Sequence, residues 1–187
     1  IPILVKRLNG QPFLPLLILF IALLQIDRYP TVSWDISFMN ILVGLTISSM
    51  IIEIFRKRPT PFINISSLLL SFIWLGIMLG CLSTLRNLPT IGFSITIALF
   101  LSVWICDTAA FWIGSKFGKR KILPTISPNK TWVGSIAGLI SSIIFMIMMY
   151  KFNYFSDSVT LHDIIFLGLI IGIFGQFGDF AESLLKR

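Results

Sequence analysis

The end of the chain carries a group of side chains that together could bind a metal ion and phosphates. The polar residues of this segment are Asp179, Glu182, Ser183, Lys186 and Arg187. On a helix, where successive side chains are about 100° apart, they fall on one stripe and apolar residues take the other positions. Carboxylates, a hydroxyl and two cations can hold a divalent metal and the phosphates that it bridges. The alternative is a ladder of salt bridges at a helix end that faces water.

A second group of interest is Asp107, which follows a long and nearly unbroken apolar run. A carboxylate at membrane depth is costly, so it usually pairs, lines a wet cavity or binds an ion. Glu53 is also close to apolar residues, but Arg56 and Lys57 follow it. This spacing predicts an ion pair at a helix end whose long side chains reach toward water.

The segment from Gly114 to Trp132 is basic and rich in turn-forming residues. Within it, Ser127-Pro128 has the pattern of an N-cap with proline at the first helical position, so we expect the next helix to begin there. A helix N-terminus bearing Lys130 and Thr131 would suit a phosphate group. The other lysines of this segment are equally typical of an ordinary basic loop beside a membrane.

Several kinds of chemistry are disfavoured by the residues present. The single histidine, His162, has no nucleophile near it in the sequence, and Cys81 and Cys106 lie in apolar runs without metal-ligand spacing. Hydrolytic triads and zinc chemistry are therefore not expected. Transfer of a phosphoryl or nucleotidyl group needs no such base when a metal and cations organise the phosphates.

These side chains must be positioned by membrane helices, because 56% of the residues are hydrophobic and only 12% are charged. The mean hydropathy is +0.92. Apolar runs near the roughly 20 residues that cross a bilayer recur along the chain. We predict an all-α polytopic bundle of about six transmembrane helices, at residues 11–27, 36–55, 64–84, 91–113, 133–152 and 163–184.

The basic residues predict the orientation of these spans. If the six spans cross the membrane in turn, twelve of the fifteen Lys and Arg residues fall on one side, and so do both ends of the chain. The positive-inside rule predicts that this side is the cytoplasmic one. The formal net charge of +7 comes from short clusters between apolar runs, with no continuous basic face. Anionic lipid or phosphate explains such clusters better than nucleic acid.

Small residues recur in the last two spans. Gly168, Gly172, Gly175 and Gly178 precede Asp179, and Gly134 and Gly138 form a pair in the preceding span. This spacing predicts close helix packing, because glycine lets two helix backbones approach each other within a membrane.

Taken together, the polar segments resemble the bacterial phosphatidate cytidylyltransferases, also called CDP-diacylglycerol synthases. The matching stretches are residues 107–114, 117–119, 127–132 and 178–187, with Gly134 and Gly138, in the family's order and spacing. The spans up to Val103 match only as hydrophobic helices. We therefore interpret residues 1–187 as one transmembrane domain, with N-terminal spans at 1–103 and a family-matching part at 104–187.

The resemblance implies condensation of CTP with phosphatidic acid to CDP-diacylglycerol and pyrophosphate, with Mg2+ required, at the cytoplasmic face of the bacterial inner membrane. It implies a multi-pass protein that contacts membrane lipid and no nucleic acid, and it allows a homodimer. The implied roles are Asp179 as metal ligand, Ser183, Lys186 and Arg187 as phosphate-binding groups of the catalytic site, Ser127, Lys130 and Thr131 as substrate-binding groups, and Asp107 as lining of the polar cavity.

Two differences from the family pattern affect these expectations. Val133 stands where the family commonly has Glu or Gln. The family signature also continues past Lys-Arg into a segment with His-Gly-Gly and further acids. We therefore expect the sequence to be a C-terminally truncated piece of a longer chain, inactive alone.

Two other functions stay open at the level of sequence. A CTP-dependent membrane lipid kinase would use similar residues and release CDP in place of pyrophosphate. A small ion-coupled transporter would use Asp107 and Asp179 as relays, as membrane carboxylates do in such proteins.

Overall fold

The structure is a computed structural model that describes residues 10–27, 37–58, 60–156 and 158–185. In these ranges the regular elements are helices, and the one β-type pairing is an isolated antiparallel bridge between Lys121 and Thr131. The predicted all-α class is confirmed.

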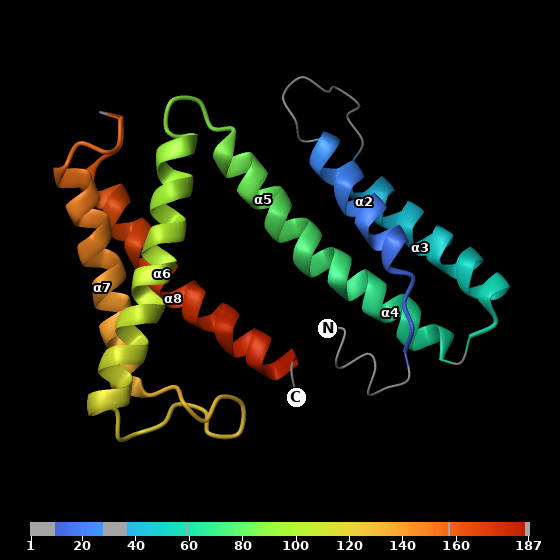
Figure 1. Cartoon of the computed structure of the whole chain (residues 1–187). Helices are drawn as coiled ribbons and strands as arrows, with labels where there is room; N and C mark the ends of the chain where they lie inside the picture. Colours follow the sequence, from blue (N-terminus) through green and yellow to red (C-terminus); the bar gives the residue numbers. More distant parts are fainter. Residues whose placement is uncertain (1–9, 28–36, 59, 157, 186–187) are drawn as a thin grey trace. The chain divides into compact units, whose positions relative to one another are not determined.

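The helices follow the predicted spans closely (Figure 1). Their bounds are Leu14–Asp27 (α2), Phe38–Arg56 (α3), Pro61–Ser71 (α4), Ile77–Arg86 (α5), Gly92–Phe117 (α6), Trp132–Lys151 (α7) and Leu161–Leu185 (α8). A π-helical turn at Phe72–Gly76 joins α4 to α5 without a break, which makes Pro61–Arg86 one continuous segment.

Five segments of the described chain are long and apolar enough to cross a bilayer: α3, the α4–α5 segment, α6, α7 and α8. They confirm five of the six predicted spans and make the chain a multi-pass membrane protein. The first predicted span corresponds to α2, which has 14 residues. At 1.5 Å per residue this helix is about 21 Å long, which is less than the roughly 30 Å of hydrocarbon in a typical bilayer.

The chain divides into two compact units, Ile1–Asn87 and Leu88–Arg187. The core of the first unit lies among α2, α3 and the α4–α5 segment, where Leu24, Leu45, Leu68 and Phe72 of the π-helical turn are buried. These residues come from the apolar faces of three consecutive helical segments, as expected for helices joined by short connections.

A buried polar cluster accompanies this core. Arg56 Nη1 donates to Glu53 Oε1 at 2.6 Å, and Asn64 Nδ2 donates to Glu53 Oε2 at 2.9 Å. The predicted pairing of Glu53 with Arg56 is confirmed, but the expectation that Glu53 reaches toward water is wrong, because its residue is only 5% exposed. The amide of Asn64 on α4 supplies the hydrogen bond that water would otherwise provide.

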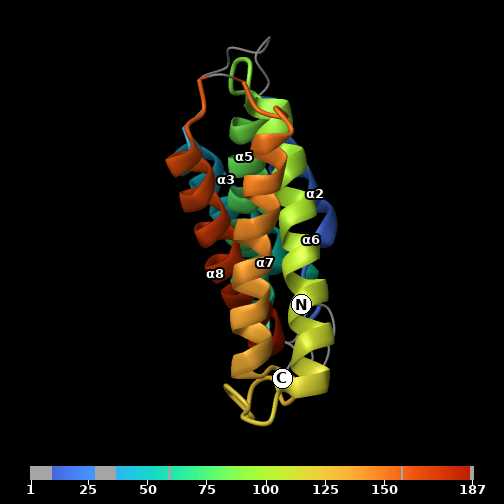
Figure 2. The ribbon, with the colours of Figure 1, turned by 90° about the vertical axis from the view of Figure 1, so that its left-hand side faces the viewer.

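In the second unit, α7 packs against both α6 and α8 (Figures 1 and 2). Glycines permit both contacts. A Cβ atom at Gly134 would lie 2.6 Å from Ala110 O on α6, and one at Gly168 would lie 2.9 Å from Ile143 Cα on α7. Gly138 and Gly172 are similarly close to the facing helix. The packing prediction is confirmed at these four positions.

Gly175 and Gly178 differ from the other glycines of α8. A Cβ atom at either position would meet no heavy atom within 4 Å in the part of the chain that the structure describes. The predicted packing is thus not found at these two positions among the described residues.

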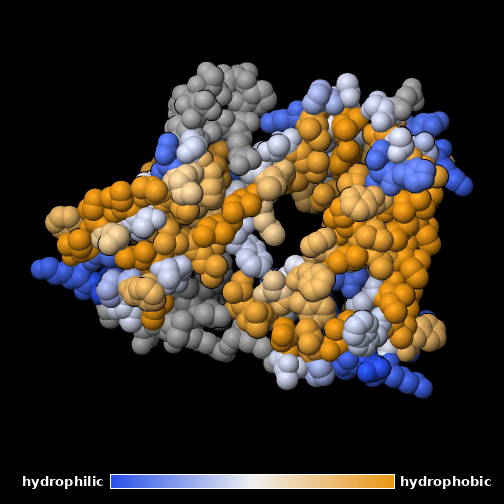
Figure 3. Space-filling view, turned by 180° about the vertical axis from the view of Figure 1, so that it is seen from behind, coloured by the Kyte–Doolittle hydropathy of each residue, from blue (hydrophilic) through white to orange (hydrophobic). Residues whose placement is uncertain are grey.

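Hydrophobic side chains cover most of the length of the helices on the face seen in Figure 3, and the most hydrophilic ones gather toward the helix ends. Many large apolar side chains of α6 and α7 are accordingly exposed, among them Trp104, Phe111, Ile136 and Ile144. This distribution is typical of helices whose outer surface faces lipid.

Candidate functional site

The loop at residues 118–131, which we call the linking loop, positions the first part of the site. It connects α6 to α7 and pairs with itself: Ile122 N donates to Lys130 O at 3.2 Å, and Trp132 N donates to Arg120 O at 3.1 Å. This pairing holds the two ends of the loop together beneath α6 and α7 (Figure 1).

The helix after this loop begins at Trp132, and its N-cap is Thr131, whose hydroxyl accepts from Gly134 N at 3.2 Å. The prediction that Ser127 caps this helix and that Pro128 opens it is wrong. Ser127 begins a turn that Lys130 N closes by donating to Ser127 O at 3.4 Å. The self-pairing of the loop keeps Thr131 extended, with φ −123° and ψ 151°, so the helix cannot start earlier.

Thr131 is buried against glycines of α6 and α7. A Cβ atom at Gly114 would lie 2.9 Å from Thr131 Oγ1, and a Cβ atom at Gly118 would overlap that hydroxyl. The glycines at the end of α6 therefore make room for the cap of α7. Since its hydroxyl already caps the helix, Thr131 anchors the loop, and its role in binding substrate stays a prediction.

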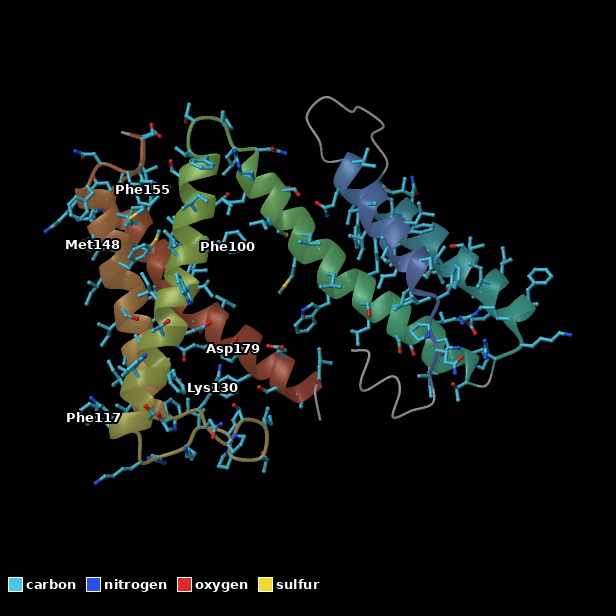
Figure 4. All side chains as sticks on the ribbon, in the orientation of Figure 1. Phe100, Phe117, Lys130, Met148, Phe155 and Asp179 are labelled. Carbon is cyan, nitrogen blue, oxygen red and sulfur yellow. The ribbon has the colours of Figure 1, made fainter. Side chains whose placement is uncertain are left out.

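Lys130 joins the linking loop to α8. Its Nζ lies 2.7 Å from Asp179 Oδ2 and 3.5 Å from Gln176 O, and it stands 4.6 Å from the centre of the Phe180 ring. Figure 4 shows Lys130 and Asp179 side by side. Asp179 therefore pairs with a lysine of the linking loop. The salt-bridge ladder within α8, the alternative considered from the sequence, does not account for this pair.

The two charges remain accessible, because the side chains of Lys130 and Asp179 are 24% and 42% exposed. An ion pair of this kind contributes about 0–1 kcal/mol to stability. A stronger ligand, such as a phosphate for the lysine or a cation for the carboxylate, can replace it at little cost.

Both residues line a polar cavity of about 580 Å3 between α6, α7, α8 and the linking loop. Its charged groups are Asp107, Asp179, Lys121 and Lys130. Its other side chains with hydroxyl or amide groups are Ser115, Ser127, Asn129, Thr131, Ser135 and Gln176. We refer to this space as the polar cavity.

The cavity brings together five of the residues singled out from the sequence: Asp107, Ser127, Lys130, Thr131 and Asp179. Ser183 lies one turn beyond Asp179 on α8 and does not line the cavity. Lys186 and Arg187 lie outside the described residues.

Gln176 is the most connected residue that the sequence analysis missed. Its Nε2 donates to Ser135 O on α7 and to Gly172 O on α8, each at 2.9 Å. It therefore ties α8 to α7 one turn before Asp179. The available signal was a polar amide inside a predicted apolar span, three residues from Asp179 and hence close to it on a helix.

A metal ion would find two carboxylates in the cavity, Asp107 and Asp179. The described ranges contain no group of three or more His, Cys, Asp or Glu side chains arranged to hold a metal. Mg2+ commonly binds through one or two carboxylates together with water and substrate phosphates. The donors present suit a magnesium ion that arrives with a nucleotide better than one held by the protein alone.

Comparison with known proteins gives a consistent result. The cytidylyltransferase family matches residues 4–187. Among curated relatives, the phosphatidate cytidylyltransferase of Staphylococcus haemolyticus (strain JCSC1435) is 34% identical over 146 residues, which are 78% of this chain and 54% of that protein. The phosphatidate cytidylyltransferase of Bacillus subtilis (strain 168) is 28% identical over 184 residues, 97% of this chain and 67% of that protein. The chain spans about half the length of the staphylococcal relative.

Proposed function

The chain belongs to the cytidylyltransferase family, and from this premise we propose that it acts in condensing CTP with phosphatidic acid to give CDP-diacylglycerol and pyrophosphate. In this reaction a phosphate oxygen of phosphatidic acid attacks the α-phosphorus of CTP. The bond from that phosphorus to the oxygen bridging to the β-phosphate breaks, and pyrophosphate leaves. The attacking phosphate is already ionised, so no histidine base is required.

The observation that carries the proposal is the contact between Lys130 and Asp179, with 2.7 Å between Nζ and Oδ2. It joins two segments that are 49 residues apart in the sequence at one polar cavity. The cavity holds cations for phosphate groups and carboxylates for a metal, which are the parts that nucleotidyl transfer needs.

We assign Lys130 to a phosphate of the substrates, with Lys121, Ser127 and Asn129 as further donors at the same wall of the cavity. When the phosphates enter, Lys130 would exchange its hydrogen bond to Asp179 for one to a phosphate oxygen. Charge-assisted hydrogen bonds of this kind are about twice as strong as neutral ones, and they stabilise the negative charge of the phosphates where the bond is made and broken.

Asp179, with Asp107 on the facing helix, would hold Mg2+ bound together with CTP. When bound, the metal neutralises phosphate charge and stabilises the leaving pyrophosphate. Release of Asp179 from Lys130 would make its carboxylate available for this role. Both partners of the resting ion pair thus acquire a ligand in the substrate complex.

We also propose that the polar cavity opens toward the cytoplasm of a bacterial cell, at its inner membrane. The linking loop carries Lys119, Arg120, Lys121 and Lys130, and Lys116 lies beside it in the last turn of α6. CTP is a cytoplasmic metabolite. The positive-inside rule supports this direction. The acyl chains of phosphatidic acid would then stay in the lipid while its phosphate reaches the cavity.

The test is a product assay with the purified full natural protein in which this sequence occurs, phosphatidic acid vesicles, CTP labelled on the cytosine ring and Mg2+. We expect labelled CDP-diacylglycerol and one pyrophosphate for each turnover, and no activity with Asp179→Ala. Release of labelled CDP with no labelled lipid would establish a CTP-dependent lipid kinase. An absence of CTP turnover together with ion-driven uptake into vesicles would establish a transporter.

A further inference from the structure

An apolar groove between α7 and α8 adjoins the polar cavity. It has a volume of about 330 Å3 and is walled by apolar side chains of the linking loop, α7 and α8, which include Leu123, Ile136, Leu139, Ile173, Phe177 and Phe180. Unlike the polar cavity, it has no charged residue in its wall. All of these elements belong to the second unit.

Two residues, Ser135 of α7 and Gln176 of α8, line both the groove and the cavity. Gln176 Nε2 donates to Ser135 O at 2.9 Å, so this hydrogen bond lies at the boundary between them. Lys130 also stands at the boundary, since it lines the cavity while its Nζ lies 4.6 Å from the centre of the Phe180 ring, a wall of the groove.

We propose that this groove holds an acyl chain of the lipid substrate while the phosphate of the same molecule lies at Lys130. The inference rests on the proposed function, which requires a substrate with an anionic head and apolar tails in one molecule. The sites for the two parts must then adjoin. The groove meets this condition, because Lys130, which would bind the phosphate head, lies over the ring of Phe180, which lines the groove.

The groove acts mainly by positioning. A chain that leaves the hydrocarbon of the bilayer for an apolar groove gains little from the hydrophobic effect, because lipid tails are as apolar as leucine. Its benefit is orientation: fixing one chain restricts where the phosphate can lie relative to the α-phosphorus of CTP. A misplacement of about 1 Å can cost on the order of a hundredfold in rate.

The chain offers a matched pair of substitutions to test this assignment. Ile136 and Ile144 lie on the same helix, two turns apart, and are 54% and 59% exposed. Ile136 is a wall of the groove and Ile144 is not. Ile136→Trp therefore fills the groove from its open side without entering the buried core, and Ile144→Trp adds the same bulk elsewhere on the surface of α7.

The experiment uses the same full natural protein in nanodiscs, with a phosphatidic acid that carries a photoactivatable diazirine on one acyl chain. Mass spectrometry then identifies the labelled residues. We expect labels on groove residues of α7 and α8, loss of most of these labels with Ile136→Trp because the indole occupies the groove, and no change with Ile144→Trp. A phosphatidylcholine with the same diazirine should leave the groove unlabelled, because its phosphate bears a choline.

Kinetics supply the second readout. With long-chain phosphatidic acid, Ile136→Trp should lower kcat/KM roughly tenfold at saturating CTP and leave the KM for CTP unchanged. A short-chain phosphatidic acid that cannot fill the groove should react equally well with both variants. If labels spread evenly over the lipid-facing side chains of α6 and α7, or if Ile136→Trp alters only the oligomeric state, the assignment is wrong. Groove labelling without any CTP turnover would refute the proposed reaction and leave the lipid site standing.

Discussion

At the scale of single residues, Lys130 is the residue that links the linking loop to α8 at the polar cavity. It is the last loop residue before the cap of α7, it pairs with Asp179 of α8, and it lies over the Phe180 ring. A lysine in this position can serve a phosphate in the cavity without moving its backbone. Its resting partner is a carboxylate that would be needed for a metal at the same moment.

Removal of this charge gives the first prediction. Lys130→Met keeps most of the apolar stem and deletes the ammonium group, so we expect kcat/KM for cytidylyl transfer to fall about 10- to 100-fold, the value of one charged hydrogen bond at roughly 1.5–3 kcal/mol. Steady-state assays with labelled CTP measure the change. Lys119→Met is the control, since Lys119 is exposed and outside the cavity wall. Equal losses in the two variants would mean that general basic charge, and not the position of Lys130, matters.

Gln176 supports a second prediction at this scale. Gln176→Leu has a similar volume but removes the hydrogen bond to Ser135 O that joins α8 to α7. We expect the free energy of unfolding in detergent to fall by about 1 kcal/mol. The KM for both substrates should rise, because α8 is then held less firmly to α7 one turn before Asp179. Gln176→Glu keeps the shape but adds a negative charge to the cavity, and it should impair CTP binding more. If both variants keep the wild-type KM values, Gln176 has no positioning role.

At the scale of elements, the glycines of α7 and α8 divide into two kinds. Gly134 lies where α7 touches α6, and a Cβ atom there would meet the backbone of Ala110 and Gly114 at 2.6 and 3.0 Å. Backbone atoms cannot turn away as a long side chain can. Gly175 on α8 has open space around it in the described structure.

This difference gives the third prediction. Gly134→Ala must push α6 and α7 apart, and overpacking of this kind costs about 1–3 kcal/mol. Gly175→Ala meets no atom, and alanine favours a helix over glycine by about 1 kcal/mol. Thermal unfolding in detergent, followed by circular dichroism, should therefore show a lower Tm for Gly134→Ala and an equal or higher Tm for Gly175→Ala. A lower Tm for Gly175→Ala would show that another segment packs against α8 at that position.

The elements also show what could be predicted from the sequence. Hydropathy was sufficient for α3 to α8, because a helix that crosses a bilayer needs a long apolar run whatever its neighbours are. Hydropathy also put the span of α7 at 133–152, within one residue of its start at Trp132, whereas the capping pattern put the helix start too early. Ser127-Pro128 has good local capping chemistry, but the pairing of Ile122 with Lys130 makes Thr131 the cap. Such pairing depends on contacts along a loop, which local propensity does not include.

The same distinction holds for the candidate site. Asp179 could be singled out because a carboxylate near an apolar run is rare, and Lys130 because it was expected at a helix N-terminus. Their direct contact depends on the packing of α7 against α8, which the sequence does not give. Gln176 was missed because a single amide in an apolar span carries no charge to draw attention. The burial of Glu53 depended on Asn64, eleven residues away and on another helix.

At the scale of the whole molecule, the orientation of the cavity decides whether the proposed reaction can use cytoplasmic CTP. α7 is a single helix of 20 residues between the linking loop and the loop that follows Lys151. If α7 crosses the bilayer, these two loops must lie on opposite sides. The density of lysines in and beside the linking loop predicts that this loop is the cytoplasmic one.

Site-directed labelling can check this prediction with two exposed positions, Thr125 in the linking loop and Ser158 after α7. In a background of Cys81→Ser and Cys106→Ser, Thr125→Cys should react with a membrane-impermeant maleimide only in inside-out vesicles, and Ser158→Cys only in intact spheroplasts. Product assays on each variant confirm that the fold is kept. The reverse pattern would place the polar cavity outside the cytoplasm, where CTP is absent, and would exclude the proposed reaction in the cell. Labelling of both positions from one side would show that α7 does not cross the membrane.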